Sequence, residues 1–337
     1  MNQDHFNKGE IPLYGSSGVY MYTDVSIYNK PSVILPAVGV PKTVFFNTGN
    51  FCCTGNTYYT VVNDLCLDTK FLYFYLLTCN LRSLAKVATG GGLSARAVIR
   101  KSDLVKIKIP IPPLTVQHQL VEDLNNLEHL HTTLSREAEL RNTLYWDTLY
   151  KLMFPLENLD KDVLGSVSIS CSKGKKDLPA SKRISGNIPY QGANGIVDYV
   201  DNYTHEGEFL LLARIGAPSL SPYSIRKYAG KFWATTNVHI LKVKETYDTQ
   251  FLFHYLRSLD FTPYINNPNS RTCLNEGSLL SIPIPKISLE EQKHIAHILD
   301  TMLELKEAVE KETELRRQQF EYYKYWLLNP EGKLETA

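Results

Sequence analysis

The sequence predicts an α/β (α+β) fold class: a tandem duplication of two mixed α/β domains, each followed by a long helix. Two observations predict this. Apolar residues recur at helical spacing through Leu120–Leu152 and again through Ile295–Leu327, and short sequence blocks recur in the same order in both halves. The length of 337 residues is enough for two domains and their connectors.

The two helical tracks have the a/d spacing of a coiled coil, so each predicts one long helix with a seam for a partner. The second track follows the first at an offset of 175 residues, which places the expected partner in the same chain. Pro155 and Pro330 follow the tracks and predict that the helices end there. The predicted seam residues are Leu120, Leu124, Leu127, Leu134 and Leu152 in the first helix and Ile295, Leu299, Met302, Val309, Phe320 and Leu327 in the second.

The repeat extends into the domains, with an offset that drifts between 173 and 181 residues as loop insertions would cause. The blocks pair Ile11–Gly18 with Ile188–Gly195, Ile34–Pro41 with Leu211–Pro218, Thr69–Leu76 with Thr249–Leu256, and Ile109–Pro112 with Ile282–Pro285. We therefore divide the chain into a first domain (1–112), a first helix (113–155), a second domain (156–287), a second helix (288–330) and a tail (331–337).

The two domains differ at their N-terminal ends. The second opens with a preamble, residues 160–187, whereas only ten residues precede the matching Ile-Pro block of the first. The first domain is therefore short at its N-terminus. It either lacks its first strand or takes that strand from elsewhere.

Short apolar runs that end in Gly and Pro predict buried strands over 31–40 and 208–216. Alternating apolar and polar residues predict half-buried strands over 57–63 and 237–244. These strands recur in the same order in both domains, which indicates one scaffold used twice.

An amphipathic pattern with aromatic residues predicts helices over 69–85 and 249–260. The Ile-Pro-Ile-Pro blocks predict an edge strand or an extended linker, because proline removes a donor from the hydrogen-bond ladder. Each block leads into a long helix, for which Thr115 and Ser288 are the expected N-caps.

Composition excludes several classes of protein. Hydrophobic residues make up 43% and charged residues 21%, as in soluble globular domains. The polar start and the absence of an apolar run near the roughly 20 residues of a membrane helix predict a cytoplasmic protein without a membrane segment. The six cysteines form no Cys-x-x-Cys pair, which predicts reduced thiols and no metal site.

The charges are distributed unevenly along the chain. The net charge is +5 over residues 1–112 and +3 over 156–287, against −3 over 113–155 and −4 over 288–337. Basic domains favour a polyanionic partner, and acidic helices favour a protein partner.

The sequence contains no convincing catalytic or cofactor site. Thr89–Ser94 is glycine-rich but lacks the Gly-Lys-Ser/Thr ending of a phosphate-binding loop. Asn266–Asn269 lacks the aromatic residue that follows Asn-Pro in adenine methyltransferases, so it predicts a turn. We therefore expect a chain that is not an enzyme and binds no cofactor.

The candidate DNA-binding residues lie in the repeated loops and before the Ile-Pro-Ile-Pro blocks. Glycine lets the backbone approach a partner, serine can bond phosphate, and arginine and asparagine can pair with guanine and adenine. For any single residue, a turn glycine or a solvated charge is the alternative interpretation. The candidates are Ser16, Ser17, Ser94, Arg96, Arg100 and Lys101 in the first domain and Asn194, Arg214, Asn269, Arg271 and Asn275 in the second.

The ordered duplication resembles the specificity subunit of a type I restriction-modification system, in which two target recognition domains are each followed by a long helix. Ile109–Gln117, and in weaker form Ile282–Gln292, resemble the family's junction between domain and helix. The segment 267–274 resembles the polar loop before that junction. This sequence departs from the pattern in its short N-terminus and in Lys286, which stands where the first block has a further proline.

The resemblance implies a mechanism. The two helices would pair as an antiparallel coiled coil that acts as a spacer, and each domain would read half of a bipartite double-stranded DNA target. Two methyltransferase subunits would bind and methylate adenine, with S-adenosylmethionine held in them and not in this chain. Restriction subunits that cleave DNA are optional further partners.

Three alternatives remain open from the residues alone. In a rearranged subunit, only the second domain would read DNA. In a coiled-coil adaptor, the domains would contact proteins and not DNA, so binding would lack the salt dependence of phosphate contacts. The third alternative is an enzyme with an unrecognised site.

Overall fold

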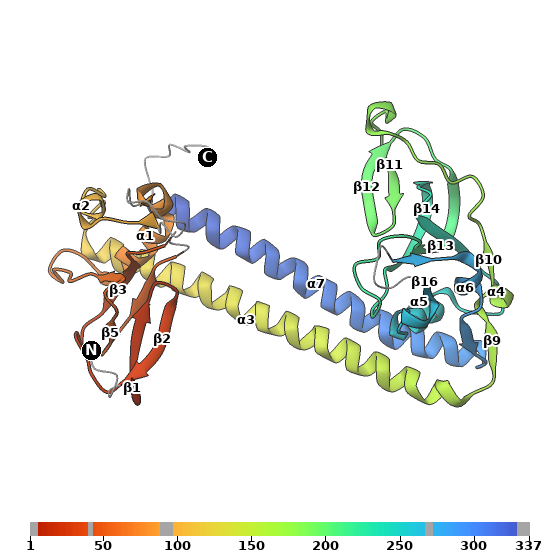
Figure 1. The fold of residues 1–337 in the computed structure, drawn as a ribbon, viewed down its shortest axis with the longest axis horizontal. Helices are drawn as coiled ribbons and strands as arrows, with labels where there is room; N and C mark the ends of the chain where they lie inside the picture. Colours follow the sequence, from red (N-terminus) through yellow and green to blue (C-terminus); the bar gives the residue numbers. More distant parts are fainter. Residues whose placement is uncertain (1–5, 40–42, 88–96, 267–271, 329–337) are drawn as a thin grey trace. The chain divides into compact units, whose positions relative to one another are not determined.

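The computed structural model describes residues 6–39, 43–87, 97–266 and 272–328. The chain forms two compact units: the first holds residues up to Ser135 together with those from Lys311 onward, and the second holds Arg136–Glu310. Each unit contains a mixed α/β domain and part of two long helices, α3 (Leu114–Met153) and α7 (Leu289–Leu328) (Figure 1). The predicted fold class is confirmed.

The domain of the first unit has two three-stranded sheets, ordered β2-β1-β5 and β4-β3-β6. Strand β3 is the buried centre of the second sheet, because its run of apolar side chains can be covered on both faces. Helix α1 begins after Asp68, whose carboxylate caps it by accepting a hydrogen bond from the Phe71 amide at 2.7 Å. The elements are β1 (Phe6–Gly15), β2 (Gly18–Thr23), β3 (Ser32–Pro36), β4 (Phe45–Asn47), β5 (Cys52–Cys53), β6 (Thr57–Tyr59), α1 (Thr69–Thr78), η2 (Leu81–Leu84), β7 (Lys86–Val87), β8 (Ala97–Val98) and α2 (Lys101–Leu104).

The domain of the second unit has one six-stranded sheet, ordered β10-β15-β13-β14-β11-β12. Helix α5 starts as α1 does, with the Asp248 carboxylate accepting from the Phe251 amide at 2.8 Å. The elements are η3 (Phe154–Asn158), β9 (Lys161–Val163), α4 (Leu164–Val167), β10 (Ser168–Ser170), η4 (Ala180–Lys182), β11 (Ile188–Gly192), β12 (Gly195–Val200), β13 (His205–Ala213), β14 (Ile225–Ala234), β15 (Val238–Val243), α5 (Thr249–Ser258), η5 (Thr262–Tyr264), β16 (Ile265–Asn266), β17 (Cys273–Leu274), α6 (Glu276–Leu280) and β18 (Pro283–Pro285).

Strand pairing repeats between the two domains at the offsets read from the sequence. In the first, Leu35 of β3 pairs with Tyr58 of β6; in the second, Leu212 of β13 pairs with His239 of β15. Likewise β1 pairs antiparallel with β2 and parallel with β5, as β11 pairs with β12 and β14. The duplication therefore extends to the hydrogen-bond register.

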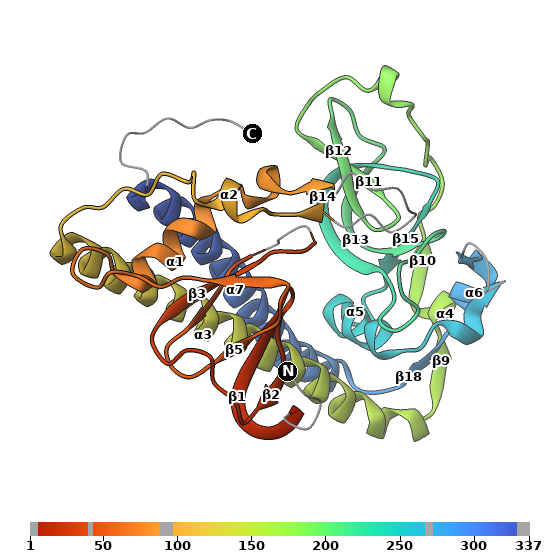
Figure 2. The same cartoon turned by 60° about the vertical axis from the view of Figure 1, so that its left-hand side comes forward.

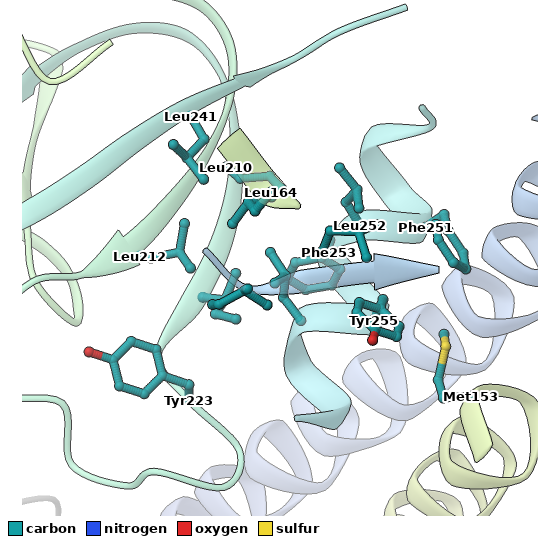
Figure 3. Close-up of a cluster of buried hydrophobic side chains, with 14 of the residues drawn as sticks. Met153, Leu164, Leu210, Leu212, Tyr223, Leu241, Phe251, Leu252, Phe253 and Tyr255 are labelled. Carbon is teal, nitrogen blue, oxygen red and sulfur yellow. The ribbon is translucent and has the colours of Figure 1, made fainter. Parts of the chain in front are cut away.

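The largest core lies in the second unit. It joins α3, α4, α5, α7 and strands β13 to β15 in one cluster of buried side chains. Figure 3 shows Leu164 of α4 beside Leu210 of β13, and Met153 of α3 beside Tyr255 of α5. Because α3 and α7 contribute to this core, each domain and the helices next to it fold as one body.

The two long helices pack against each other within each unit, in opposite directions. In the first unit the start of α3 lies beside the end of α7, with α1 next to them (Figure 2). Leu124 and Leu328 are buried there with Phe71 and Phe74 of α1. In the second unit the end of α3 meets the start of α7, where Leu149 and Leu299 are fully buried. The expected pairing of the helices is thus observed.

The predicted seam residues differ in burial. Leu124, Ile295 and Leu299 are buried, and the side chain of Leu327 lies outside the described residues. The half-buried members are Leu120, Leu127, Leu134, Leu152, Met302, Val309 and Phe320.

Several predicted boundaries were wrong. The strand expected over 57–63 ends at Tyr59, because no counterpart of β10 is found among the described residues to pair with its continuation, whereas β15 is paired with β10 up to Val243. The helix expected over 69–85 ends at Thr78, and Leu81–Leu84 forms a separate 3-10 turn.

The two expected caps had different outcomes. Ser288 does cap α7, accepting from the Glu291 amide at 3.2 Å. Thr115 does not cap α3, because the helix begins one residue earlier and the Pro113 carbonyl accepts from the amides of Val116 and Gln117.

Candidate nucleic-acid interface

Hydrogen bonds bring three predicted loops of the second domain together. The Asn194 side-chain amide donates to the Gly216 carbonyl at 2.8 Å. The Gly216 amide donates to the Thr272 carbonyl, and the Leu274 amide donates to the Arg214 carbonyl, both at 2.9 Å. Asn194 and Arg214 therefore lie close to the segment before α6, although they are far from it in sequence.

The side chains of this group are held differently. The Arg214 guanidinium donates to the Thr236 carbonyl at 3.3 Å and remains half-exposed. The Asn275 carboxamide oxygen accepts from the Ser278 amide at 2.7 Å and caps α6, so that oxygen already has a partner. Asn269 and Arg271 lie outside the described residues.

A basic loop missed in the sequence lies beside Arg214. The Lys175 ammonium donates to the Val238 carbonyl at 2.8 Å, and the Asp177 carboxylate accepts from the Thr236 amide at 3.0 Å. Burial, helped by the nearby Arg214 charge, lowers the pKa of Lys175 below its ordinary value. The run Lys173-Gly-Lys175-Lys176 is a basic signal that can be read in the sequence of the preamble, where only the absence of a counterpart in the first domain was interpreted.

The repeated glycine loop of the second domain rests on Arg226. Its guanidinium donates to the Gln191 side chain at 2.8 Å and to the Gly192 and Ala193 carbonyls at 2.7 and 3.1 Å. Burial lowers the pKa of Arg226 to about 10, which leaves it charged at neutral pH. Gly195 has a φ of +155°, a backbone conformation that favours glycine. The arginine thus fixes the loop that presents Asn194.

Of the predicted residues of the first domain that the structure describes, Ser17, Arg100 and Lys101 are exposed and Ser16 is half-buried. The Ser16 hydroxyl donates to the Asn56 carbonyl at 3.3 Å, and Ser17 lies in the exposed turn between β1 and β2. Arg100 and Lys101 are exposed at the start of α2. Ser94 and Arg96 lie outside the described residues.

The same glutamine clamp joins each domain to its long helix. In the first unit the buried Gln117 accepts from the Asp68 amide at 2.8 Å and donates to the Cys66 and Pro112 carbonyls. In the second unit the buried Gln292 accepts from the Asp248 amide at 2.8 Å and donates to the Ile287 carbonyl at 3.0 Å. One side chain therefore fixes the N-cap of α1 or α5 to the first turn of α3 or α7.

We expect Gln292→Ala to lower the free energy of unfolding of the second unit by about 1–3 kcal/mol, because it leaves the Asp248 amide without its partner in a buried place. Urea denaturation followed by tryptophan fluorescence measures this. The exposed neighbour variant Lys293→Ala is the control and should change stability by less than about 0.5 kcal/mol. Equal effects of the two variants would rule out the clamp.

A polar network replaces apolar packing at one place in the second unit. The Tyr145 hydroxyl lies 3.0 Å from Nδ1 of His254, whose Nε2 lies 2.9 Å from the Asp300 carboxylate. The Lys227 ammonium pairs with the same carboxylate at 2.9 Å. Burial lowers the pKa of His254 to about 4 and raises that of Tyr145 to about 12, so the histidine is neutral and the tyrosine protonated at pH 7.

The corresponding positions of the first unit are Phe320 and Phe74, which pack in the cluster of α1, α3 and α7. Since aromatic rings fill the same place there, the network's role is to position α5 on the helices. The described residues contain no group of three or more His, Cys, Asp or Glu side chains able to hold a metal ion. Among the same residues, no helix combines the length and apolar character that a bilayer crossing needs.

A family model matches both domains of this chain. The family model described as type I restriction modification DNA specificity domain matches residues 2–141 and 161–316. The chain belongs to this family. The resemblance drawn from the sequence is thereby confirmed, and the two matched segments correspond to the two copies of the repeat.

Relatives in the type I specificity family span different parts of the chain. A Haemophilus influenzae protein named as a type I restriction enzyme specificity subunit is 42% identical over 174 residues, which are 49% of this chain and 45% of that protein. This match therefore spans less than half the length of that relative. A type I specificity subunit of Mycoplasma pneumoniae is 25% identical over 315 residues, covering 85% of this chain and 89% of its own length.

A solved structure of the type I specificity family shares the fold. The crystal structure of the S subunit of a type I restriction-modification system from M. genitalium gives a TM-score of 0.71 at 19% identity, covering 97% of this chain and 91% of that one. At this identity the likeness concerns the fold alone.

Proposed function

We propose that this chain reads a bipartite double-stranded DNA target in the cytoplasm, and that partner subunits act on the DNA it selects. Two methyltransferase subunits would methylate adenine, and restriction subunits would cleave. Residues 1–112 and 156–287 would be the two readers, and the helices 113–155 and 288–330 the spacer between them. The chain itself would perform no catalysis.

The observation that carries this proposal is the repeated register. Two domains with equivalent strand pairing each end in the same glutamine clamp on a pair of antiparallel helices. The loops differ between the copies where the framework agrees, as two readers of different half-sites require. The charge of Arg214, with Lys175 close to it, and the carboxamide of Asn194 suit phosphate and base edges.

The test is methylation mapping of DNA from cells that express this chain with a methyltransferase subunit of the same system. The proposal expects two short half-sites separated by a fixed gap. No new methylation, with the methyltransferase subunit shown to be active with another reader, would contradict it.

A second candidate is that only the second domain reads DNA. It is favoured by the first domain, where the described residues include no counterpart of β9, α4 or β10. This candidate expects a single half-site or its palindrome in the same mapping experiment.

We expect Arg214→Ala to weaken specific DNA binding about tenfold or more, because a lost arginine–base contact costs about 1–3 kcal/mol. The measurement is fluorescence anisotropy on the mapped site at several salt concentrations. Lys231→Ala, which removes an exposed charge paired with Glu206, is the control. An affinity that does not fall with salt for the unaltered chain would favour the protein adaptor over a DNA reader.

A further inference from the structure

A side chain holds the same backbone carbonyl in both domains. In the first, the Tyr58 hydroxyl of β6 donates to the Ile99 carbonyl at 3.2 Å. In the second, Nε2 of His239 in β15 lies 2.8 Å from the Leu274 carbonyl. Because a carbonyl only accepts hydrogen bonds, Nε2 of this histidine carries a proton. The strand pairing places Tyr58 and His239 at equivalent positions, so a phenol and an imidazole make the same contact.

The amide of the held residue is bound as well. The Ile99 amide donates to the Ala37 carbonyl at 2.9 Å. The Leu274 amide donates to the Arg214 carbonyl, also at 2.9 Å. Ile99 and Leu274 are buried, at 1% and 0% exposure, so each is fixed through both of its backbone polar groups. We call this arrangement the latch of each domain: Tyr58, Ile99 and Ala37 in the first, and His239, Leu274 and Arg214 in the second.

Each latch lies next to candidate residues of the DNA interface. The residue that follows the held carbonyl is Arg100 in the first domain and Asn275 in the second, and each is the N-cap residue of a short helix, α2 or α6. In the second domain the latch also includes Arg214, whose guanidinium remains half-exposed. The latch therefore fixes the backbone of candidate readers that are far apart in sequence.

The latch is retained while the residues around it change. Ala37 stands where the second domain has Arg214, and Arg100 stands where it has Asn275. The donor changes too, yet it reaches the same carbonyl. Burial lowers the pKa of His239 below its ordinary value, so the ring is neutral at pH 7 and Nε2 is its one N–H donor. A contact that persists through such changes indicates that the position of this carbonyl matters.

We propose that Tyr58 and His239 are positioning residues for DNA reading, each acting on the half-site of its own domain. This inference rests on the proposed function. Without its donor, the latch carbonyl would lose its partner, and the segment that carries Arg100 or Asn275 would no longer be held to the sheet. An arginine or asparagine must meet a base edge in a fixed plane to make two hydrogen bonds, whereas phosphate contacts carry no sequence information. A displaced backbone therefore weakens discrimination between bases.

The experiment maps methylation in cells that express the full chain with the methyltransferase subunit of the same system. It compares sites that match the motif with sites that carry one mismatched base pair in either half. Tyr58→Phe removes one oxygen and keeps the ring. We expect it to lower the discrimination against first-half mismatches about fivefold, as the loss of one typical hydrogen bond does, and to leave the second half unchanged. Tyr59→Phe, on the same strand but packed on Tyr28 and Phe51, is the control and should change neither half.

A matched pair of variants tests the second domain. His239→Leu removes the donor and leaves a buried carbonyl without a partner, so the discrimination against second-half mismatches should fall about tenfold or more. His239→Gln keeps an amide donor near the place of Nε2 and should recover most of that discrimination. Urea denaturation measures the stability of each variant separately from its reading.

Several results would overturn the assignment. Unchanged discrimination by Tyr58→Phe and by a folded His239→Leu would leave the latch a contribution to stability alone. Equal relaxation of both halves by either variant would indicate a general loss of the complex. A map with one half-site would remove the assignment of Tyr58. No methylation directed by the unaltered chain, with a methyltransferase subunit active with another reader, would contradict the proposed function itself, and this inference would fall with it.

Discussion

Replacing Leu134 by proline is expected to abolish site-specific methylation directed by this chain. Leu134 lies inside α3, so proline would remove a helical hydrogen bond and clash with the preceding turn, at a local cost of about 3 kcal/mol. Under the proposed function, a bend at this point would misdirect the two proposed readers relative to one DNA target. Methylation mapping measures the loss, and circular dichroism measures how much helix remains.

Two matched variants separate the helix from the side chain. Thr133→Ala, at the exposed neighbouring position, should leave methylation unchanged. Leu134→Ala keeps the helix and removes a half-buried seam contact, so a partial effect is expected. Normal methylation directed by the Leu134→Pro variant would refute the spacer role of α3.

Acidification from pH 7 towards pH 4 is expected to destabilise the second unit by about 3 kcal/mol through His254 alone. Burial holds the pKa of this histidine at about 4 in the folded chain, against about 6.5 when unfolded. Between these values the unfolded chain binds a proton that the folded chain does not, so the free energy of unfolding falls as the pH falls. Burial opposes the charge of Asp300, but hydrogen bonds from Lys227 and His254 outweigh it and lower the pKa of that carboxyl. The stability that the Asp300 carboxylate contributes is therefore lost only at still lower pH.

The matched variant is His254→Phe, which places the residue of the corresponding first-unit position, Phe74, in the network. This change removes the titrating group, so the stability lost between pH 6.5 and 4 should largely disappear, although stability at pH 7 also falls with the lost hydrogen bonds. Urea denaturation at a series of pH values measures both. If the free energy of unfolding falls with pH as steeply as in the unaltered chain, another group titrates.

The helices and the duplication could be predicted because their signals are local. The a/d spacing of Leu120–Leu152 and the two Ile-Pro-Ile-Pro blocks are visible in short windows of sequence. Strand ends were less predictable, because the end of β6 at Tyr59 depends on whether a second strand pairs beyond it.

The candidate interface could be predicted only in part. Asn194 and Arg214 were identifiable as polar residues in repeated loops. The hydrogen bonds from Asn194 to Gly216 and from Arg214 to Thr236 depend on strand pairing that no short window of sequence contains. The network of Tyr145, His254 and Asp300 was missed for the same reason, since its first two members are 109 residues apart in sequence. Non-local pairing is what the sequence pattern does not report.

The two glutamine clamps have a consequence for how such a reader can change. Because Gln117 and Gln292 tie each domain to the first turn of a helix, one residue added to both helices would rotate a domain by about 100° and advance it by about 1.5 Å. Only the insertion of whole heptads keeps the seams facing each other, because seven residues rotate the rest of the helix by only about 20° from its former direction. Each heptad adds about 10 Å, or roughly three base pairs of DNA. If the chain reads two half-sites as proposed, the gap between them should therefore change in discrete steps when the helices lengthen.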